Sequence, residues 1–208
     1  MKVIFYHLMP FALAHGGLQI QILQSRSALA RVGVEVEFLR WMDASQTGDV
    51  LHFFGRMPTA LLQSAHAKGW KVVQAELLTE QGARSQGRLA LERLMRRGMV
   101  RVLPRLLTSG FHWDSYRLAD ACVALTAWEA RLMKTVYGAP DGRIHVVPNG
   151  VEEVFLNSAP AARGPWLVCT ATITERKRVL ELAEAAVRAR TPLWIIGKPY
   201  SESDPYAQ

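Results

Sequence analysis

Two adjacent glycines near the amino terminus have the right type and position to bind an anion. Gly16 and Gly17 lie between a short apolar run and the start of an expected helix. Glycines let the backbone approach a ligand closely, and the free amides and positive dipole end of a helix favour negative charge. A tight turn without a ligand is the alternative, because the third glycine of a dinucleotide motif and the Lys-Ser/Thr of a phosphate-binding loop are missing.

A second candidate anion site lies in residues 172–179. Arg176, Lys177 and Arg178 are adjacent at the expected start of a helix. Three cations at that end oppose the helix dipole unless an anion compensates them, and a solvated basic helix start is the alternative. Facing each other across a hinge, the two sites would form a clamp for a diphosphate.

Most of the net charge lies in one segment. The chain carries +7, and residues 81–108 hold seven arginines against one acid, Glu92, which accounts for +6. Apolar residues recur there at spacings of three and four, which predicts a basic amphipathic helix or helix pair. No nucleic-acid partner is expected, because no aromatic residues interleave with these arginines. The candidates to contact an anionic membrane surface or a phosphorylated substrate are Arg93, Arg96, Arg97 and Arg101.

A solvated basic face on a core-packing helix is the alternative for that segment. The composition of the whole chain is that of a soluble globular protein, with 50% hydrophobic and 21% charged residues. Cys122 and Cys169 lie in apolar runs, so we expect buried free thiols and, from their spacing, no metal site. No signal peptide and no apolar run near the ~18 residues that span a bilayer are visible, so we expect a cytoplasmic protein.

Strand and helix patterns alternate along the first 150 residues. Strands are predicted over residues 2–7, 34–40, 49–55, 71–76, 120–126 and 143–148. Helices are predicted over 18–33, 58–69 and 127–138, with the basic segment between the fourth and fifth strands. Short apolar strands that alternate with helices predict an α/β fold, with a parallel sheet covered on both faces.

The turn Pro148-Asn149-Gly150 marks a boundary, because the pattern restarts after it. We predict a domain over 1–150, a linker over 151–164 and a second domain over 165–208. The second domain has one βαβ unit, with strands over 165–172 and 191–197 and a helix over 175–190. So small a unit leaves its apolar strands uncovered, so we expect a fragment whose second domain continues beyond Gln208.

Residues 16–39, 49–55, 119–155 and 170–186 resemble, in order and spacing, the retaining family-four glycosyltransferases. The resemblance covers nearly the whole chain, and its most specific parts are the Gly-Gly loop and the 120–155 block with its VPNGV. It implies a GT-B fold of two Rossmann-like domains. Residues 1–150 would be the acceptor-side half, and residues 165–208 the first βαβ unit of the donor domain.

The resemblance implies transfer of a sugar, with retention, from a nucleotide-diphosphate donor to a carbohydrate or lipid-linked acceptor, without a metal or other cofactor. Gly16 and Gly17 would approach the donor phosphates, and Lys177 would pair with the diphosphate as charge builds on the leaving group. Many relatives carry a Gly-Arg pair before that lysine. Here Thr172 offers a hydroxyl instead, and Arg176 is the candidate substitute.

The family's paired glutamates would lie beyond Gln208, so we expect this chain to bind donor weakly and to be inactive. The catalytic residues are unknown. Near the end of the fourth strand, where relatives often place a histidine, the chain offers Glu76, for which helix capping is the alternative. His15 beside the glycines is a second candidate, and His52 is expected to be a satisfied strand-end histidine.

Two other function classes stay open. One is an epimerase or hydrolase on the same GT-B architecture, which would use the same cleft for another reaction. The other is a non-catalytic binding module attached through residues 81–108 to the inner face of the membrane, which would make the protein peripheral.

Overall fold

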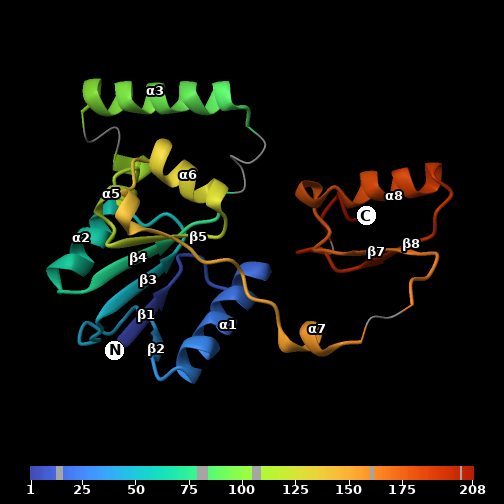
Figure 1. The fold of residues 1–208 in the computed structure, drawn as a ribbon, viewed down its shortest axis with the longest axis horizontal. Coiled ribbons are helices and arrows are strands. Elements are labelled where there is room, and N and C mark those ends of the chain that lie inside the picture. Colours follow the sequence, from blue (N-terminus) through green and yellow to red (C-terminus); the bar gives the residue numbers. More distant parts are fainter. Residues whose placement is uncertain (13–15, 79–83, 105–108, 160–161, 202) are drawn as a thin grey trace. The chain divides into compact units, whose positions relative to one another are not determined.

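The structure, a computed structural model, describes residues 1–12, 16–78, 84–104, 109–159, 162–201 and 203–208 (Figure 1). These residues form two compact units. The first comprises Met1–Leu8 and Gln21–Gly150, and the second comprises Met9–Ile20 and Val151–Gln208. Each unit holds its own parallel sheet.

The first unit is built on a six-stranded sheet in the order β2-β1-β3-β4-β5-β6, in which every pair of neighbours is parallel. This confirms the predicted α/β class and Rossmann-like sheet. The strands are β1 (Lys2–Tyr6), β2 (Glu35–Phe38), β3 (Val50–Phe54), β4 (Lys71–Ala75), β5 (Ala121–Ala124) and β6 (Ile144–Val146).

Helices connect these strands, as parallel pairing requires. They are α1 (Gly17–Arg31), α2 (Thr59–Ala67), α3 (Gln86–Val102), α5 (Ser115–Leu118) and α6 (Ala127–Thr135), with 3₁₀ turns at Ser109–Phe111 and Asp141–Arg143. Pro58 precedes α2, and Gly69 with a φ of +80° follows it, as the sequence predicts. The described part of the predicted basic helical segment contains helix α3, which lies beyond α6 as seen from the strands (Figure 1).

The period-two alternation of the strands puts apolar side chains on both faces of the sheet. Ile4, Tyr6, Leu51 and Phe53 belong to a core cluster that also contains side chains of α2 and α6. Phe5 and Phe54 point the other way and meet edge to face, with ring centroids 5.0 Å apart. Burying each such side chain stabilises the fold by about 2–3 kcal/mol. Both faces are therefore occupied, as a parallel sheet needs.

The second unit pairs β7 (Leu167–Thr170) with β8 (Leu193–Ile196) in parallel. Its helices are α7 (Glu153–Asn157) and α8 (Val179–Arg188). The predicted helix over 175–190 is wrong at its start: Glu175–Lys177 form a 3₁₀ turn, and Arg178 is left-handed with a φ of +53°, so α8 begins only at Val179. The exposed large apolar side chains on or beside the two strands are Trp166, Leu167, Val168, Trp194, Ile195 and Ile196.

Candidate functional site

The sheet order creates a place for a ligand at the carboxyl ends of the strands. β1 has β2 on one side and β3 on the other, so the order reverses between β1 and β3. At such a point the loops that follow neighbouring strands run to opposite faces and leave a crevice. Arg56 follows β3, and Glu76 follows the adjacent β4, at this same carboxyl edge.

Arg56 and Glu76 form a two-pronged ion pair. Arg56 Nε lies 3.1 Å from Glu76 Oε2, and Arg56 Nη2 lies 3.1 Å from Glu76 Oε1. The Arg56 side chain is 24% exposed and that of Glu76 18% exposed. Paired, bidentate geometry holds both groups in one orientation and compensates their partial removal from water.

Two tyrosines complete the cluster. The Tyr116 hydroxyl donates to Glu76 Oε2, and Tyr116 stacks on Tyr137 with ring centroids 4.5 Å apart. The Arg56 guanidinium lies over both rings, 4.7 Å from the centroid of Tyr137 and 5.6 Å from that of Tyr116. Burial alone lowers the pKa of Arg56, but the charge of Glu76 outweighs it and raises the pKa above its ordinary value. Burial raises the pKa of Tyr116, so its hydroxyl stays protonated.

Sequence reasoning selected Glu76 but missed Arg56 and Tyr116. Arg56 and Glu76 lie in loops, and Tyr116 lies in the short helix α5. Glu76 is 20 residues from Arg56 and 40 residues from Tyr116, so no local sequence pattern indicates that the three are in contact. Among the described residues, the Glu76 carboxylate binds side chains and no helix-terminal amide, so the helix-capping alternative is not what the structure shows.

Glu129 is a second buried carboxylate at this edge. It accepts hydrogen bonds from Leu78 N (3.1 Å) and Leu125 N (2.7 Å), while Thr126 Oγ1 accepts from Glu129 N. Glu129 therefore ties the segment after β4 to the turn between β5 and α6. A local signal was available here, because Thr126-x-x-Glu129 has the spacing of a capping box.

His52 lies within β3, not at its end. Its ring stacks on Phe54, with centroids 4.4 Å apart, and meets Phe5 edge to face at 5.3 Å. Nε2 is buried and has no hydrogen-bond partner among the described residues, so the prediction of a satisfied histidine is wrong on that point. Burial lowers the pKa of His52 to about 4, which keeps the ring neutral.

The opposite, amino edge of the sheet carries a structural carboxylate. Asp120, just before β5, accepts from His66 Nε2 (2.8 Å), Lys71 Nζ (3.0 Å) and Val72 N (2.9 Å). Burial by itself raises the pKa of Asp120, but the hydrogen bonds from Val72 N, His66 and Lys71 outweigh it and lower the pKa to about 2. Asp120 therefore joins α2, β4 and β5 as a permanent anion.

The glycine pair lies at the start of α1. Gly16 has a φ of +157°, which glycine adopts most readily, and its carbonyl accepts from Gln19 N at 3.1 Å. Gly17 is the first residue of the helix, and a Cβ at that position would meet no described atom within 4 Å. Packing among the described residues therefore gives no reason for a glycine at 17. His15 lies outside the described residues.

The cationic segment of the second unit lies before α8, not in its first turn. Arg176 and Lys177 are exposed in the 3₁₀ turn, and neither forms an ion pair with a described residue. Arg178 differs, because its Nε lies 3.0 Å from Glu181 Oε1. The Tyr206 hydroxyl accepts from Leu180 N at 2.9 Å and donates to Glu181 Oε2 at 2.7 Å, which caps α8. Thr172 follows β7. The amide of Ala171 before it donates to the carbonyl of Ile196 at the end of β8, and the amide of Ile173 after it donates to the carbonyl of Lys198.

The four arginines expected to contact a membrane or acceptor separate into two pairs. Arg97 and Arg101 are exposed on α3. Arg93 and Arg96 are partly buried, and the Nε atom of each is enclosed without a hydrogen-bond partner among the described residues. The helix therefore presents only half of this predicted set directly to solvent.

The two cysteines do not form a disulfide with each other. Cys122 is buried, and burial raises its pKa to about 11, while Cys169 is only partly buried. Both thiols are free. The described residues contain no group of three or more His, Cys, Asp or Glu side chains arranged to hold a metal ion. None of the described helices has the length and apolar character needed to cross a bilayer.

The chain was compared with models of protein families. The model of Glycosyltransferase Family 4 matches residues 49–154, from the start of β3 to the beginning of α7. The matched region contains Arg56, Glu76, Tyr116 and Glu129. No curated protein matches the chain in a sequence comparison.

Proposed function

The chain belongs to glycosyltransferase family 4, and from this membership we propose that it takes part in the transfer of a sugar from a nucleotide-diphosphate donor. The acceptor would be a carbohydrate or a lipid-linked sugar, and the reaction would proceed with retention and without a metal. The observation that carries the proposal is the family match over residues 49–154, which includes the polar cluster at the carboxyl edge of the six-stranded sheet.

We assign the donor diphosphate to Gly16, Gly17, Thr172, Arg176 and Lys177. All five belong to the second unit. Arg176 and Lys177, which form no ion pair with a described residue, supply the positive charge that a leaving diphosphate requires, and the glycines at the start of α1 supply amides. The charge of Arg178 is already compensated by Glu181, so we leave Arg178 out of this set.

We assign the acceptor to the carboxyl edge of the first unit, while His15 stays a candidate from the sequence alone. Glu76 holds Arg56 in place, and the fixed guanidinium can orient an acceptor hydroxyl or phosphate. The pairing also favours transfer over hydrolysis or epimerisation. A carboxylate bound to both Arg56 and Tyr116 is a poor free base or nucleophile.

We expect this chain to bind donor weakly. The described part of its second unit has two strands whose apolar side chains are largely exposed, which leaves few enclosed groups to hold a ribose and a sugar. Weak binding is accessible to saturation-transfer NMR, which does not require a stable complex.

The test uses nucleoside-diphosphate sugars of uridine, guanosine and adenosine. We expect saturation transfer to at least one of them, a weaker signal for Lys177→Ala, and no change for Arg188→Ala, a matched control at the other end of α8. Absence of signal for every donor would contradict the donor class, and equal signals for both variants would contradict the role of Lys177. Micromolar binding by calorimetry would contradict the weak-binding expectation.

A further inference from the structure

Helix α3 exposes several large apolar side chains, although three of its charged side chains are partly buried against the protein. Leu89 is buried, and Glu92, Arg93 and Arg96 are partly buried. A surface helix of a globular protein normally has the opposite arrangement. An exposed apolar surface of this kind indicates a partner that is itself apolar. The large apolar side chains that α3 exposes, by 55–79%, are Leu91, Leu94, Met95 and Val102.

Cations border this apolar stripe. Arg88, Arg97 and Arg101 are exposed on the same helix, and none of them forms an ion pair with a described residue. An amphipathic helix with apolar side chains and flanking arginines is complementary to an anionic lipid interface. The apolar side chains enter the boundary between headgroups and acyl chains, and the arginines contact the headgroups.

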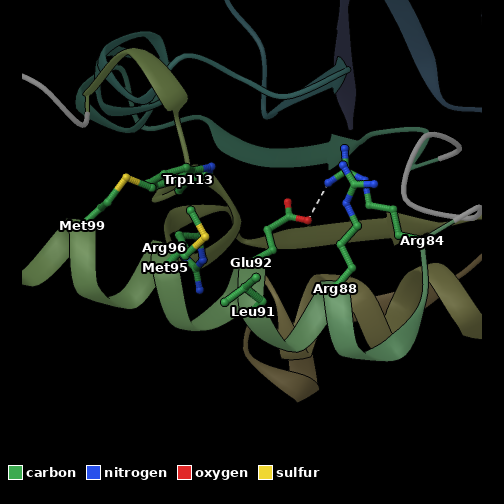
Figure 2. A pocket seen from close by; sticks show the side chains of 8 residues that line it. All are labelled: Arg84, Arg88, Leu91, Glu92, Met95, Arg96, Met99 and Trp113. Carbon is green, nitrogen blue, oxygen red and sulfur yellow. Dashed lines mark hydrogen bonds and ion pairs between the residues drawn. The ribbon is translucent and has the colours of Figure 1, made fainter.

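A pocket of about 260 Å³ lies along α3 (Figure 2). Arg84, Arg88 and Glu92 line one end, and Met99 and Trp113 line the other. Three arginines and one glutamate line it in total, so the lining carries a net charge of +2. Sites for whole small molecules usually occupy about 300–1,000 Å³. The pocket is therefore suited to a headgroup and not to an entire nucleotide sugar.

Two features of the lining favour an incoming lipid phosphate. Arg84 Nη1 is only 2.5 Å from Glu92 Oε2, but the guanidinium of Arg88 has no partner among the described residues, and the Nε of Arg96 is enclosed without one. Unsatisfied donors gain free energy when an acceptor reaches them. Trp113 stacks on the half-exposed Phe111 at 4.6 Å, and aromatic side chains are favoured at membrane–water interfaces.

We propose that the α3 pocket binds the phosphate headgroup of an anionic lipid, with Arg84 and Arg88 on the phosphate and the stripe Leu91, Leu94, Met95 and Val102 in the lipid interface. The first unit would then attach to a membrane surface through α3, lying in the plane of that surface. The inference does not depend on sugar transfer, because attachment can be measured without donor or acceptor.

The experiment measures binding of the whole chain to vesicles by flotation. Phosphatidylcholine vesicles with and without phosphatidylglycerol test charge dependence, and inorganic phosphate alone tests a free anion. The double variant Arg84→Gln/Arg88→Gln should bind anionic vesicles about 30-fold more weakly, since each arginine at the surface contributes about a fivefold gain in binding. The matched control, Arg188→Gln/Arg190→Gln, makes the same charge change in the second unit.

The control variant should bind anionic vesicles less than about threefold more weakly than the parent. Leu94→Asp should also weaken vesicle binding, although Leu94 does not line the pocket. Arg88→Gln alone serves as a second pocket variant, because it leaves the Arg84–Glu92 ion pair in place. If both double variants lost vesicle binding equally, the proposal that the pocket binds the lipid phosphate would be overturned. Equal binding to neutral vesicles, or a Trp113 response to inorganic phosphate without vesicle binding, would overturn the lipid assignment.

Discussion

Glu76 is the side chain on which the carboxyl-edge cluster depends. It binds Arg56 through both oxygens and accepts from Tyr116, in a setting where neither charged side chain is more than a quarter exposed. Removing one partner of such a pair leaves the other charge partly desolvated and unpaired. The cluster is thus a stability element as well as the candidate acceptor site.

We expect Glu76→Gln to lower the free energy of unfolding by about 2 kcal/mol, below the range for fully buried pairs because water still reaches this one. Arg56→Lys keeps the charge but loses the two-pronged geometry, so it should lower the free energy of unfolding by less than Glu76→Gln does. Urea denaturation measures both. A Glu76→Gln variant within about 0.5 kcal/mol of the parent would show that the cluster contributes little.

His52 makes a prediction about pH. Its folded pKa of about 4 lies below the ordinary value of 6.5, so the unfolded state binds the extra proton between these two values. This contribution to stability is complete above pH 6.5 and is lost as the pH falls toward 4, by up to about 3 kcal/mol. His52→Phe keeps a flat ring on Phe54 and removes the titration.

The measurement for His52 is the difference in unfolding free energy between parent and variant at pH 7, 5.5 and 4. The difference should shift in favour of His52→Phe as the solution becomes more acidic, while contributions from the other histidines cancel. A difference that stays constant over this window would show that the ring titrates normally in the folded protein.

At the scale of elements, Asp120 joins α2, β4 and β5 through one carboxylate. Hydrogen bonds to a charged group contribute more than neutral ones, and Asp120 is only partly exposed. We expect Asp120→Asn to lower stability by about 1–2 kcal/mol at neutral pH. Because its pKa is lowered from 3.8 to about 2, that difference should be complete above about pH 4 and should be lost progressively as the pH falls from there toward 2.

Asp141→Asn is the matched control for Asp120. Its ion pair with Lys134 lies at 2.6 Å but joins side chains that are 73% and 52% exposed. Exposed pairs contribute little, so the control should change stability by less than about 0.5 kcal/mol. Equal effects of the two asparagine variants would mean that Asp120 does not tie the elements together.

At the scale of the whole molecule, the two units differ in how their strands are covered. Four of the five residues of β1 are buried, whereas no residue of β7 is. Local opening is easiest where few apolar contacts are lost. We expect backbone amides of β7 and β8 to exchange with solvent on the order of 100-fold faster than those of β1 and β3, measured by native-state hydrogen exchange. Equal protection in both sheets would contradict this.

Local chemistry made most of the fold predictable. Each of the six strands of the first unit was expected within a few residues, because apolar runs, prolines and glycines act on their own neighbourhood. Lys177 was expected in the first turn of α8 but lies before it, because no local sequence pattern predicts the left-handed conformation of Arg178. Arg56 was missed because its partner lies 20 residues away. The inward charges of α3 were missed because periodicity identifies an amphipathic helix but not which side faces the protein.

The sequence alone therefore determined the α/β class, the alternation of elements, the turn at Pro148–Gly150 as a predicted boundary, the concentration of charge in residues 81–108 and the family resemblance. All of these depend on residues close together in the chain. Only the tertiary structure decided the strand order, the Arg56–Glu76–Tyr116 cluster and the outward apolar stripe of α3. These features depend on which distant segments pack together, and that packing is determined by the burial of surface over the whole unit.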